Sequence, residues 1–183
     1  MSGYGSNVTS DGKPIGADSD FIPPSVGIQE NVTLKSIEVD REKGRCVFEF
    51  VQADGAVVRH TEFDGEEDWQ IDTTNRRVKH IATRFVTEEE YHAAVEGSKG
   101  FLDFSSRVKN LIDAKNSEDI KFRMIFRYDK NYKYVVLPQY PNFIELMSVE
   151  ESKLVITNYD QGFLKKPSPD EEAKGASDVD SEY

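Results

Sequence analysis

Basic and aromatic side chains are interleaved between Lys121 and Tyr134. This stretch holds five Lys or Arg residues, five aromatic residues and a single acid, Asp129. Aromatic rings stack on the bases of a nucleic acid, each stack contributing ~1–3 kcal/mol, and cations follow the phosphates. A groove that binds single strands without regard to sequence needs this mixture of side chains. The stretch therefore predicts a surface for single-stranded nucleic acid.

Alternation divides this stretch into two faces, because successive side chains of a strand point in opposite directions. One face carries the cations together with one apolar residue: Lys121, Arg123, Ile125 and Arg127. The other face carries residues typical of a core: Phe122, Met124, Phe126 and Tyr128. The pattern predicts an exposed cationic face above a buried aromatic one. A solvated strand face over ordinary core aromatics would give the same pattern, and the sequence leaves both interpretations open.

A second basic run, from Arg76 to Arg84, contains no acid. At helical spacing most of its cations lie roughly on one side, and Arg59 on the preceding strand is placed to border the same groove. A solvated helix face neutralised by the acids at 88–90 is an equally good interpretation. The residues predicted to contact nucleic acid are Arg59, Arg76, Arg77, Lys79, Lys121, Arg123, Arg127, Tyr128, Tyr132, Lys133 and Tyr134.

Two aromatic residues stand outside these runs. Trp69, the single tryptophan, lies in an acidic stretch, and Tyr140 lies between Pro138 and Pro141. Each is either an anchor in the core or a platform on which a base stacks. The sequence does not decide between these two roles.

The chain closes with an acidic segment. Residues 168–183 contain six acids against one lysine, in a context of Pro, Ala and Gly that cannot build a core, so they are predicted to be disordered. Such a tail is expected to compete with nucleic acid for a cationic groove or to dock on a partner protein. The residues predicted to contact that partner are Asp178, Asp180, Glu182 and Tyr183. A purely solubilising tail is the alternative.

The net charge of −11 argues against nucleic acid as a ligand, because phosphate contacts need Lys and Arg. The tail accounts for much of this charge, and residues 1–167 carry a net charge of −6. Local patches, rather than the total charge, therefore decide what the folded part binds.

The sequence contains no recognisable catalytic or metal-binding motif. Cys46 is the single cysteine, and the three histidines lie far apart without cysteine partners, so no zinc site is indicated. The acids at 62–68 resemble a solvated loop and lack the spacing of a metal nuclease. No phosphate loop or nucleophile elbow is present. We therefore expect a protein that is not an enzyme and uses no cofactor.

Hydrophobic patterning predicts three strands, then three helices, then two strands. The strands span 31–40, 45–52, 56–63, 121–128 and 132–137, with a bulge after Leu34 and a tight turn at Asp54 and Gly55. The helices span 76–86, 87–96 and 101–114. This order predicts a mainly β chain with a helical insertion, arranged as an OB-like five-stranded β-barrel. Other small barrels and α+β meanders share the order.

The expected organisation has three parts. Residues 1–25 form a flexible arm, residues 26–165 form the OB-like domain that binds single-stranded DNA, and residues 166–183 form the disordered tail. No apolar run approaches the ~18–20 residues of a membrane helix, so the expected location is the cytoplasm.

Three runs carry a resemblance to a known family: GIQENVTL at 27–34, RVKHIATRFV at 77–86 and YPNFIE at 140–145. In these runs, and in element order over residues 26–165, the chain resembles phage-encoded single-stranded DNA-binding proteins. The tail is similar in kind to the acidic, aromatic-ended tails through which replicative binding proteins of phages and bacteria engage polymerase, helicase-primase and recombination proteins. The resemblance implies an OB-fold, a role in DNA replication, recombination or repair, and the cytoplasm of a host cell.

These observations together predict a protein that coats single-stranded DNA with little sequence preference. A structural or cargo protein of a virion, or an interaction protein built on the same barrel, is the alternative.

Overall fold

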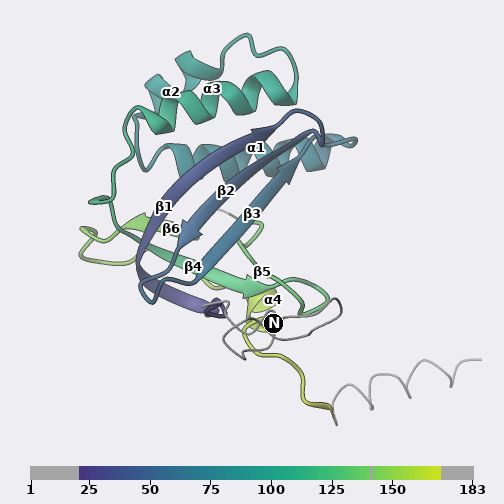
Figure 1. Cartoon of the computed structure of the whole chain (residues 1–183), viewed down its shortest axis with the longest axis vertical. Coiled ribbons are helices and arrows are strands. Elements are labelled where there is room, and N and C mark those ends of the chain that lie inside the picture. Colours follow the sequence, from purple (N-terminus) through teal and green to yellow (C-terminus); the bar gives the residue numbers. More distant parts are fainter. Residues whose placement is uncertain (1–20, 141, 170–183) are drawn as a thin grey trace, which may run out of the picture.

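The computed structural model describes residues 21–140 and 142–169, which form a mixed α/β fold around an antiparallel sheet (Figure 1). The strands are β1 (Gly27–Asp40), β2 (Arg45–Val51), β3 (Val57–Phe63), β4 (Phe122–Tyr128), β5 (Val135–Val136) and β6 (Ile144–Leu146). The helices are α1 (Asp68–Ala82), α2 (Glu88–Val95), α3 (Phe101–Asp113) and α4 (Asn158–Gln161). The strand order is β3-β2-β1-β4-β5, and β6 also pairs with β4.

β1 is long because it pairs with two different strands. Its first part, residues 27–32, pairs with β4, and its second part, residues 33–40, pairs with β2. The register shifts twice along β1, between Gln29 and Val32 and between Leu34 and Ser36. A bulge bends a strand and increases its twist, so these shifts turn the sheet from β2 round to β4. The bulge after Leu34 is the one that the sequence predicted, and the strand begins earlier than predicted.

α1 begins earlier than the sequence predicted, at Asp68 instead of Arg76. Its start is held by Gln70, whose Oε1 accepts hydrogen bonds from the backbone N–H groups of Glu66 and Glu67 at 2.9 and 3.0 Å. The acids that indicated a loop therefore lie around a helix N-terminus, where negative charge is favourable. As a result, Trp69 belongs to the first turn of a helix.

The other two predicted helices begin where the sequence indicated. At the start of α2, Thr87 Oγ1 accepts from the Glu90 backbone N–H, and Glu90 Oε2 accepts from the Thr87 backbone N–H, at 3.2 and 2.8 Å. This reciprocal pair is the predicted capping box. α3 follows Gly100, whose φ of 84° is open to glycine at little steric cost.

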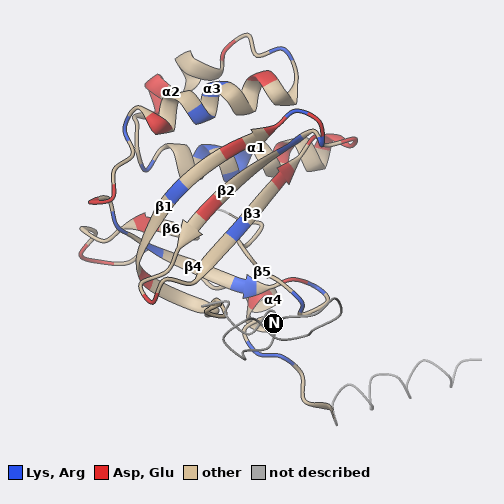
Figure 2. Ribbon diagram, viewed as in Figure 1, with Lys and Arg blue, Asp and Glu red and all other residues tan. Residues whose placement is uncertain are grey.

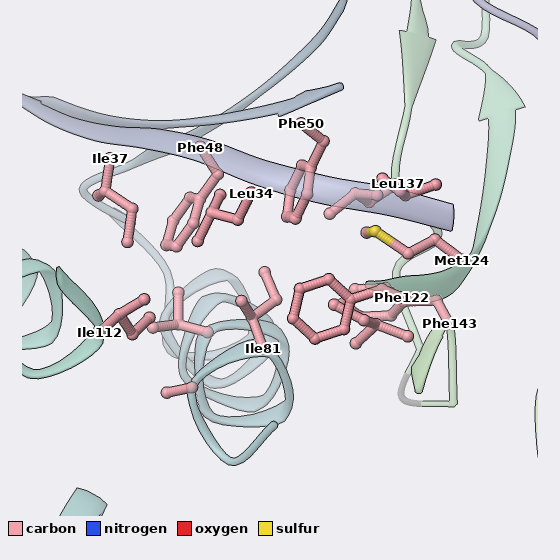
Figure 3. Packing of buried hydrophobic residues seen from close by; sticks show 14 of the residues in the cluster. Leu34, Ile37, Phe48, Phe50, Ile81, Ile112, Phe122, Met124, Leu137 and Phe143 are labelled. Carbon is pink, nitrogen blue, oxygen red and sulfur yellow. The ribbon is translucent and has the colours of Figure 1, made fainter. Parts of the chain in front are cut away.

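The core lies between the β1–β3 part of the sheet and α1, which crosses behind these strands (Figure 1). Phe48 and Phe50 of β2 point from the sheet toward Ile81 of α1, and all three side chains are fully buried (Figure 3). Phe122 and Met124 extend the same core onto β4. The predicted core face of β4 is therefore confirmed for Phe122, Met124 and Phe126, whereas Tyr128 at the end of the strand is only half-buried.

The sequence predicted that the opposite face of β4 is open to solvent, but in the structure most of it is covered. The chain that follows β5 returns along the strand. The Ile125 N–H donates to the carbonyl of Phe143, and the Tyr128 N–H donates to the carbonyl of Phe163, both at 2.8 Å. Ile125 and Arg127, which belong to this face, are both buried. The alternation of side chains along β4 was predicted correctly, but the burial of its cationic face was not.

The prediction of a closed, mainly β barrel is confirmed only in part. The antiparallel strands, their order and the helical insertion are present, but the helices make this a mixed α/β fold. Six strands replace the predicted five. Among the described residues no hydrogen-bonded ladder joins β3 to β5, although these two strands approach each other.

The two predicted terminal segments fall largely outside the described residues. Of the arm, only residues 21–25 are described, and they contain neither helix nor strand. Ser25 is fixed by Gln52: its N–H donates to Gln52 Oε1, and its carbonyl accepts from Gln52 Nε2, both at 2.8 Å. Of the predicted tail, residues 170–183 lie outside the described part, and the residues predicted to bind a partner protein are among them.

A buried charged cluster joins β3 to α1. Glu62, 2 % exposed on β3, accepts from His60 Nε2 at 2.7 Å, from Thr74 Oγ1 at 3.0 Å and from Arg77 Nη2 at 2.8 Å. Arg77 Nε pairs with the same carboxylate. Burial by itself would raise the pKa of Glu62, but the hydrogen bonds from His60 and Arg77 outweigh it and lower the pKa to about 2. Glu62 is therefore ionised and part of the structure, not of a solvated acidic loop.

We predict that this cluster makes stability depend on pH in the acid range. The unfolded carboxyl takes up a proton near its ordinary pKa of 4.5, whereas the folded one does so near 2. Roughly 3 kcal/mol of stability is thus present above the unfolded pKa and is lost as pH falls through this window. Urea denaturation at several pH values measures it. Glu62→Gln should be less stable at neutral pH and should have a flatter profile, and the exposed Glu89→Gln should match the wild type; identical profiles for all three proteins would contradict the assignment.

Candidate nucleic-acid interface

Arg127, predicted to be an exposed cation, is a buried structural residue. Its Nε lies 3.0 Å from Asp160 Oδ1, and the two side chains are 7 % and 2 % exposed. The guanidinium also lies over a pair of adjacent rings, 5.6 Å from the centroid of Tyr159 and 4.9 Å from that of Phe163. This arrangement fastens the C-terminal segment to β4. The predicted exposure of Arg127 is therefore wrong, because α4 supplies an acid that covers it.

Arg123 is likewise engaged within the fold. Its Nη1 lies 2.6 Å from Glu145 Oε1 on β6, and its Nε lies 3.1 Å from Glu30 Oε1 on β1. Burial would raise the pKa of Glu145, but hydrogen bonds from Ser152, from the Lys153 backbone N–H and from Arg123 lower it. Arg123 thus links β4 to both of its neighbours, and its predicted exposed position is also wrong.

Three more of the predicted cations have acidic partners. Arg77 belongs to the buried cluster around Glu62, and Lys79 lies 2.5 Å from Glu88. Arg59 projects from the outer face of β3, where it shares Glu49 with Lys35 at 2.7 and 3.0 Å. Lys and Arg indeed alternate with Asp and Glu over β1, β2 and β3 (Figure 2). This outer face therefore has no surplus of positive charge to offer to phosphates.

The turn between β4 and β5 keeps its predicted cations and rings at the surface. Asp129 organises it, since its Oδ1 accepts from the backbone N–H groups of Lys133 and Tyr134 at 2.7 and 3.1 Å. Tyr134 is 60 % exposed, and Lys133 Nζ lies 5.2 Å from its ring centroid. Asp129 thus holds the backbone of the turn. Lys130, Lys133 and Tyr134 are exposed, whereas Tyr132 is half-buried and its ring lies 5.5 Å from that of Phe163 between centroids.

The C-terminal segment adds cations to this turn. Tyr132 donates from its hydroxyl to the Gly162 carbonyl at 2.9 Å, and Lys166 Nζ lies 5.2 Å from the ring centroid of Tyr128. The sequence prediction did not include this neighbourhood, although Thr157 and Asp160 have the spacing of a helix cap that could have revealed α4. We call this group the tyrosine–lysine surface; its members are Tyr128, Lys130, Tyr132, Lys133, Tyr134, Lys165 and Lys166. Among the described residues its four lysines make no ion pair with an acid.

Lys121 does not join the tyrosine–lysine surface. It is exposed at the beginning of β4, whereas the turn follows the end of that strand. At ~3.3 Å per residue, a strand of this length separates the two positions by roughly 20 Å. Of the predicted residues on β4 and its turn, the structure brings together those from Tyr128 onward.

Arg76 lies at a second place, on the exposed side of α1. It lines an open pocket of about 380 Å³ together with Trp69, Asp72, Thr73, Gln139 and Tyr140. Trp69 is 61 % exposed and Tyr140 is 50 % exposed. Of the two roles left open for these rings, that of a core anchor is therefore excluded for both.

No protein-family model, curated protein or solved structure matches this chain significantly. Within the described residues, no helix is long and apolar enough to cross a membrane. The same residues contain no group of three or more His, Cys, Asp or Glu side chains arranged to hold a metal ion.

We predict that Arg127 contributes to stability. Arg127→Ala leaves Asp160 buried without its cation, which should lower the free energy of unfolding by about 3–5 kcal/mol. Urea denaturation measures the loss. Lys130→Ala, an exposed cation on the neighbouring turn, should stay within about 0.5 kcal/mol of the wild type. If Arg127→Ala were as stable as the wild type, the pair would not be structural and Arg127 would return to the candidate ligand-binding residues.

Proposed function

We propose that this protein binds and coats single-stranded DNA with little sequence preference, as a non-enzymatic component of DNA replication, recombination or repair. The observation that carries the proposal is the tyrosine–lysine surface. Three tyrosines and four lysines without acidic partners in the described chain provide rings for bases and cations for phosphates. Stacking of this kind tolerates every base because each has a π-face, which accounts for binding without sequence preference.

The fold supports an OB-like interpretation. β1, β2 and β3 form a meander, the helices are inserted between β3 and β4, and the bent β1 is shared by β2 and β4. β3 and β5 approach each other at the two ends of the strand order, which is where an OB barrel closes. In such barrels the loop between the fourth and fifth strands is one of the elements that contact single strands. The tyrosine–lysine surface is built on the corresponding turn, between β4 and β5.

The charge distribution is compatible with the proposal in spite of the acidic total. Most strand cations are paired with acids inside the fold, so they neither attract DNA nor repel it. The tyrosine–lysine surface lies at the opposite end of the molecule from α2 and α3 (Figure 2), and Asp129, the acid in its turn, is bound to the backbone of that turn. An interaction or virion protein with the same fold remains the second candidate, and DNA binding distinguishes the two.

We predict that the full chain binds labelled oligo(dT) and that its affinity falls steeply as salt rises. Replacing Lys130 and Lys133 by alanine should weaken binding and lower the slope of log K against log salt by about 0.7 for each phosphate that is no longer neutralised. Fluorescence anisotropy over a salt series measures both quantities.

The matched control is the pair Lys99→Ala and Lys115→Ala, which removes the same charge beside α3 at the other end of the molecule. These substitutions should have little effect on affinity. Absence of oligo(dT) binding by the wild type at low salt would refute the function, and equal losses in the two double variants would refute its location on the tyrosine–lysine surface.

We further expect the acidic tail to compete with DNA. Its attachment follows Lys165 and Lys166, so its six acids are tethered beside the proposed surface at an effective concentration of the order of millimolar. A chain ending at Pro167 should bind oligo(dT) more tightly at low salt, and the gain should shrink as screening increases. Removal of Tyr183 alone should leave DNA affinity nearly unchanged but weaken the binding of a partner protein to the tail. Weaker DNA binding by the shortened chain, or no change at any salt concentration, would favour a solubilising tail.

A further inference from the structure

A pocket on the exposed side of α1 is not explained by the requirements of the fold. Trp69, Asp72, Thr73 and Arg76 line one side of it, at the spacing of successive helical turns, and Gln139 and Tyr140 line the other side. We call it the α1 pocket. Its volume of about 380 Å³ lies within the ~300–1,000 Å³ range of pockets that hold small ligands.

Both rings of the α1 pocket are left without aromatic neighbours. Within the described chain neither Trp69 nor Tyr140 contacts another ring, and more than half of Trp69 is open to solvent. Large aromatic side chains dominate the energetics of cores and interfaces when they are buried, so two exposed ones at a single pocket indicate a ligand with a flat, apolar face.

The polar groups of the pocket suit a nucleotide. Arg76 is exposed and makes no ion pair with an acid in the described part of the chain, so its guanidinium is available to a phosphate. The Thr73 hydroxyl is already committed, because it donates to the Trp69 carbonyl at 2.7 Å. The side chains of Gln139 and Asp72 remain to meet polar atoms at the edge of a base.

The side of the pocket opposite α1 is held in position by His80. The Asn142 backbone N–H donates to His80 Nε2 at 3.0 Å, and the imidazole packs edge-on against Phe143 at 5.1 Å between centroids. Burial, together with the nearby Arg84, lowers the pKa of His80 to about 4. The ring is therefore neutral at physiological pH and acts as the acceptor, which fastens the chain beside Tyr140 to α1.

We propose that the α1 pocket binds one base of the same DNA strand that crosses the tyrosine–lysine surface, stacked on Trp69 and Tyr140 with its phosphate near Arg76. This inference rests on the proposed function. Tyr134 and Tyr140 are joined by a short stretch through β5, which spans at most roughly 20 Å. Single strands occupy ~4–16 nucleotides on an OB fold, so one strand reaches both places.

The single tryptophan makes the test direct, because all indole emission of the full chain comes from Trp69. Oligo(dT) should quench this emission in step with the anisotropy of a labelled strand. Trp69→Ala and Tyr140→Ala should each weaken binding by about 5- to 100-fold, whereas Trp69→Phe and Tyr140→Phe, which keep a ring, should recover most of the affinity. Arg76→Ala should reduce the salt slope by about 0.7.

The matched control is Ile71→Ala, an exposed apolar side chain on the first turns of the same helix that does not line the α1 pocket. It should bind as the wild type does, and a thermal melt should confirm that every variant is folded. If the wild type binds oligo(dT) while the emission of Trp69 and the affinities of the Trp69 and Tyr140 variants remain unchanged, the α1 pocket is not a base site, although the proposed function stands. Failure of the wild type to bind overturns both.

Discussion

The architecture depends on one strand that holds two partners at the same time. The first part of β1 binds β4 and the second part binds β2, so β1 is the hydrogen-bonded link between the meander and everything that follows α3. Asn31 lies within the first register shift and adopts a φ of 58°, which asparagine tolerates better than most residues. Both candidate binding places depend on this link, because the tyrosine–lysine surface follows β4 and one side of the α1 pocket follows β5.

An excess of acids determines which cations are available to a ligand. The chain has 34 Asp and Glu residues against 23 Lys and Arg residues, and the cations within strands find acids on neighbouring elements. Arg123 and Arg127 hold β6 and α4 against β4, and Arg77 holds α1 against β3. The cations of the β4–β5 turn, the C-terminal segment and the outer side of α1 escape this pairing. Ligand binding is therefore expected there, away from the outer face of the β1–β3 sheet.

Local patterns in the sequence predicted the elements, whereas contacts between distant residues decided their surroundings. The alternation of apolar and polar residues predicted β2, β3 and β4, and the capping box at Thr87 predicted α2. Gly55 predicted the turn between β2 and β3, where it adopts a φ of 92°. The start of α1 was missed because acids before a helix resemble a loop until their N-terminal position is known. The burial of Arg127 depends on Asp160, and the α1 pocket brings Trp69 to Tyr140; neither pairing leaves a periodic pattern in the sequence.

The two partners of β1 also differ in when they become available. The meander of β1, β2 and β3 is local and can form early, but β4 is synthesised only after all three inserted helices. Pairing over so long a separation is slow, and an unpaired strand edge is a template for another chain. The edge of the first part of β1 is therefore unpaired until β4 has been synthesised. Glu30 and Asn31, both exposed there, put a charge and a polar amide on that edge, which discourages aggregation between nascent chains.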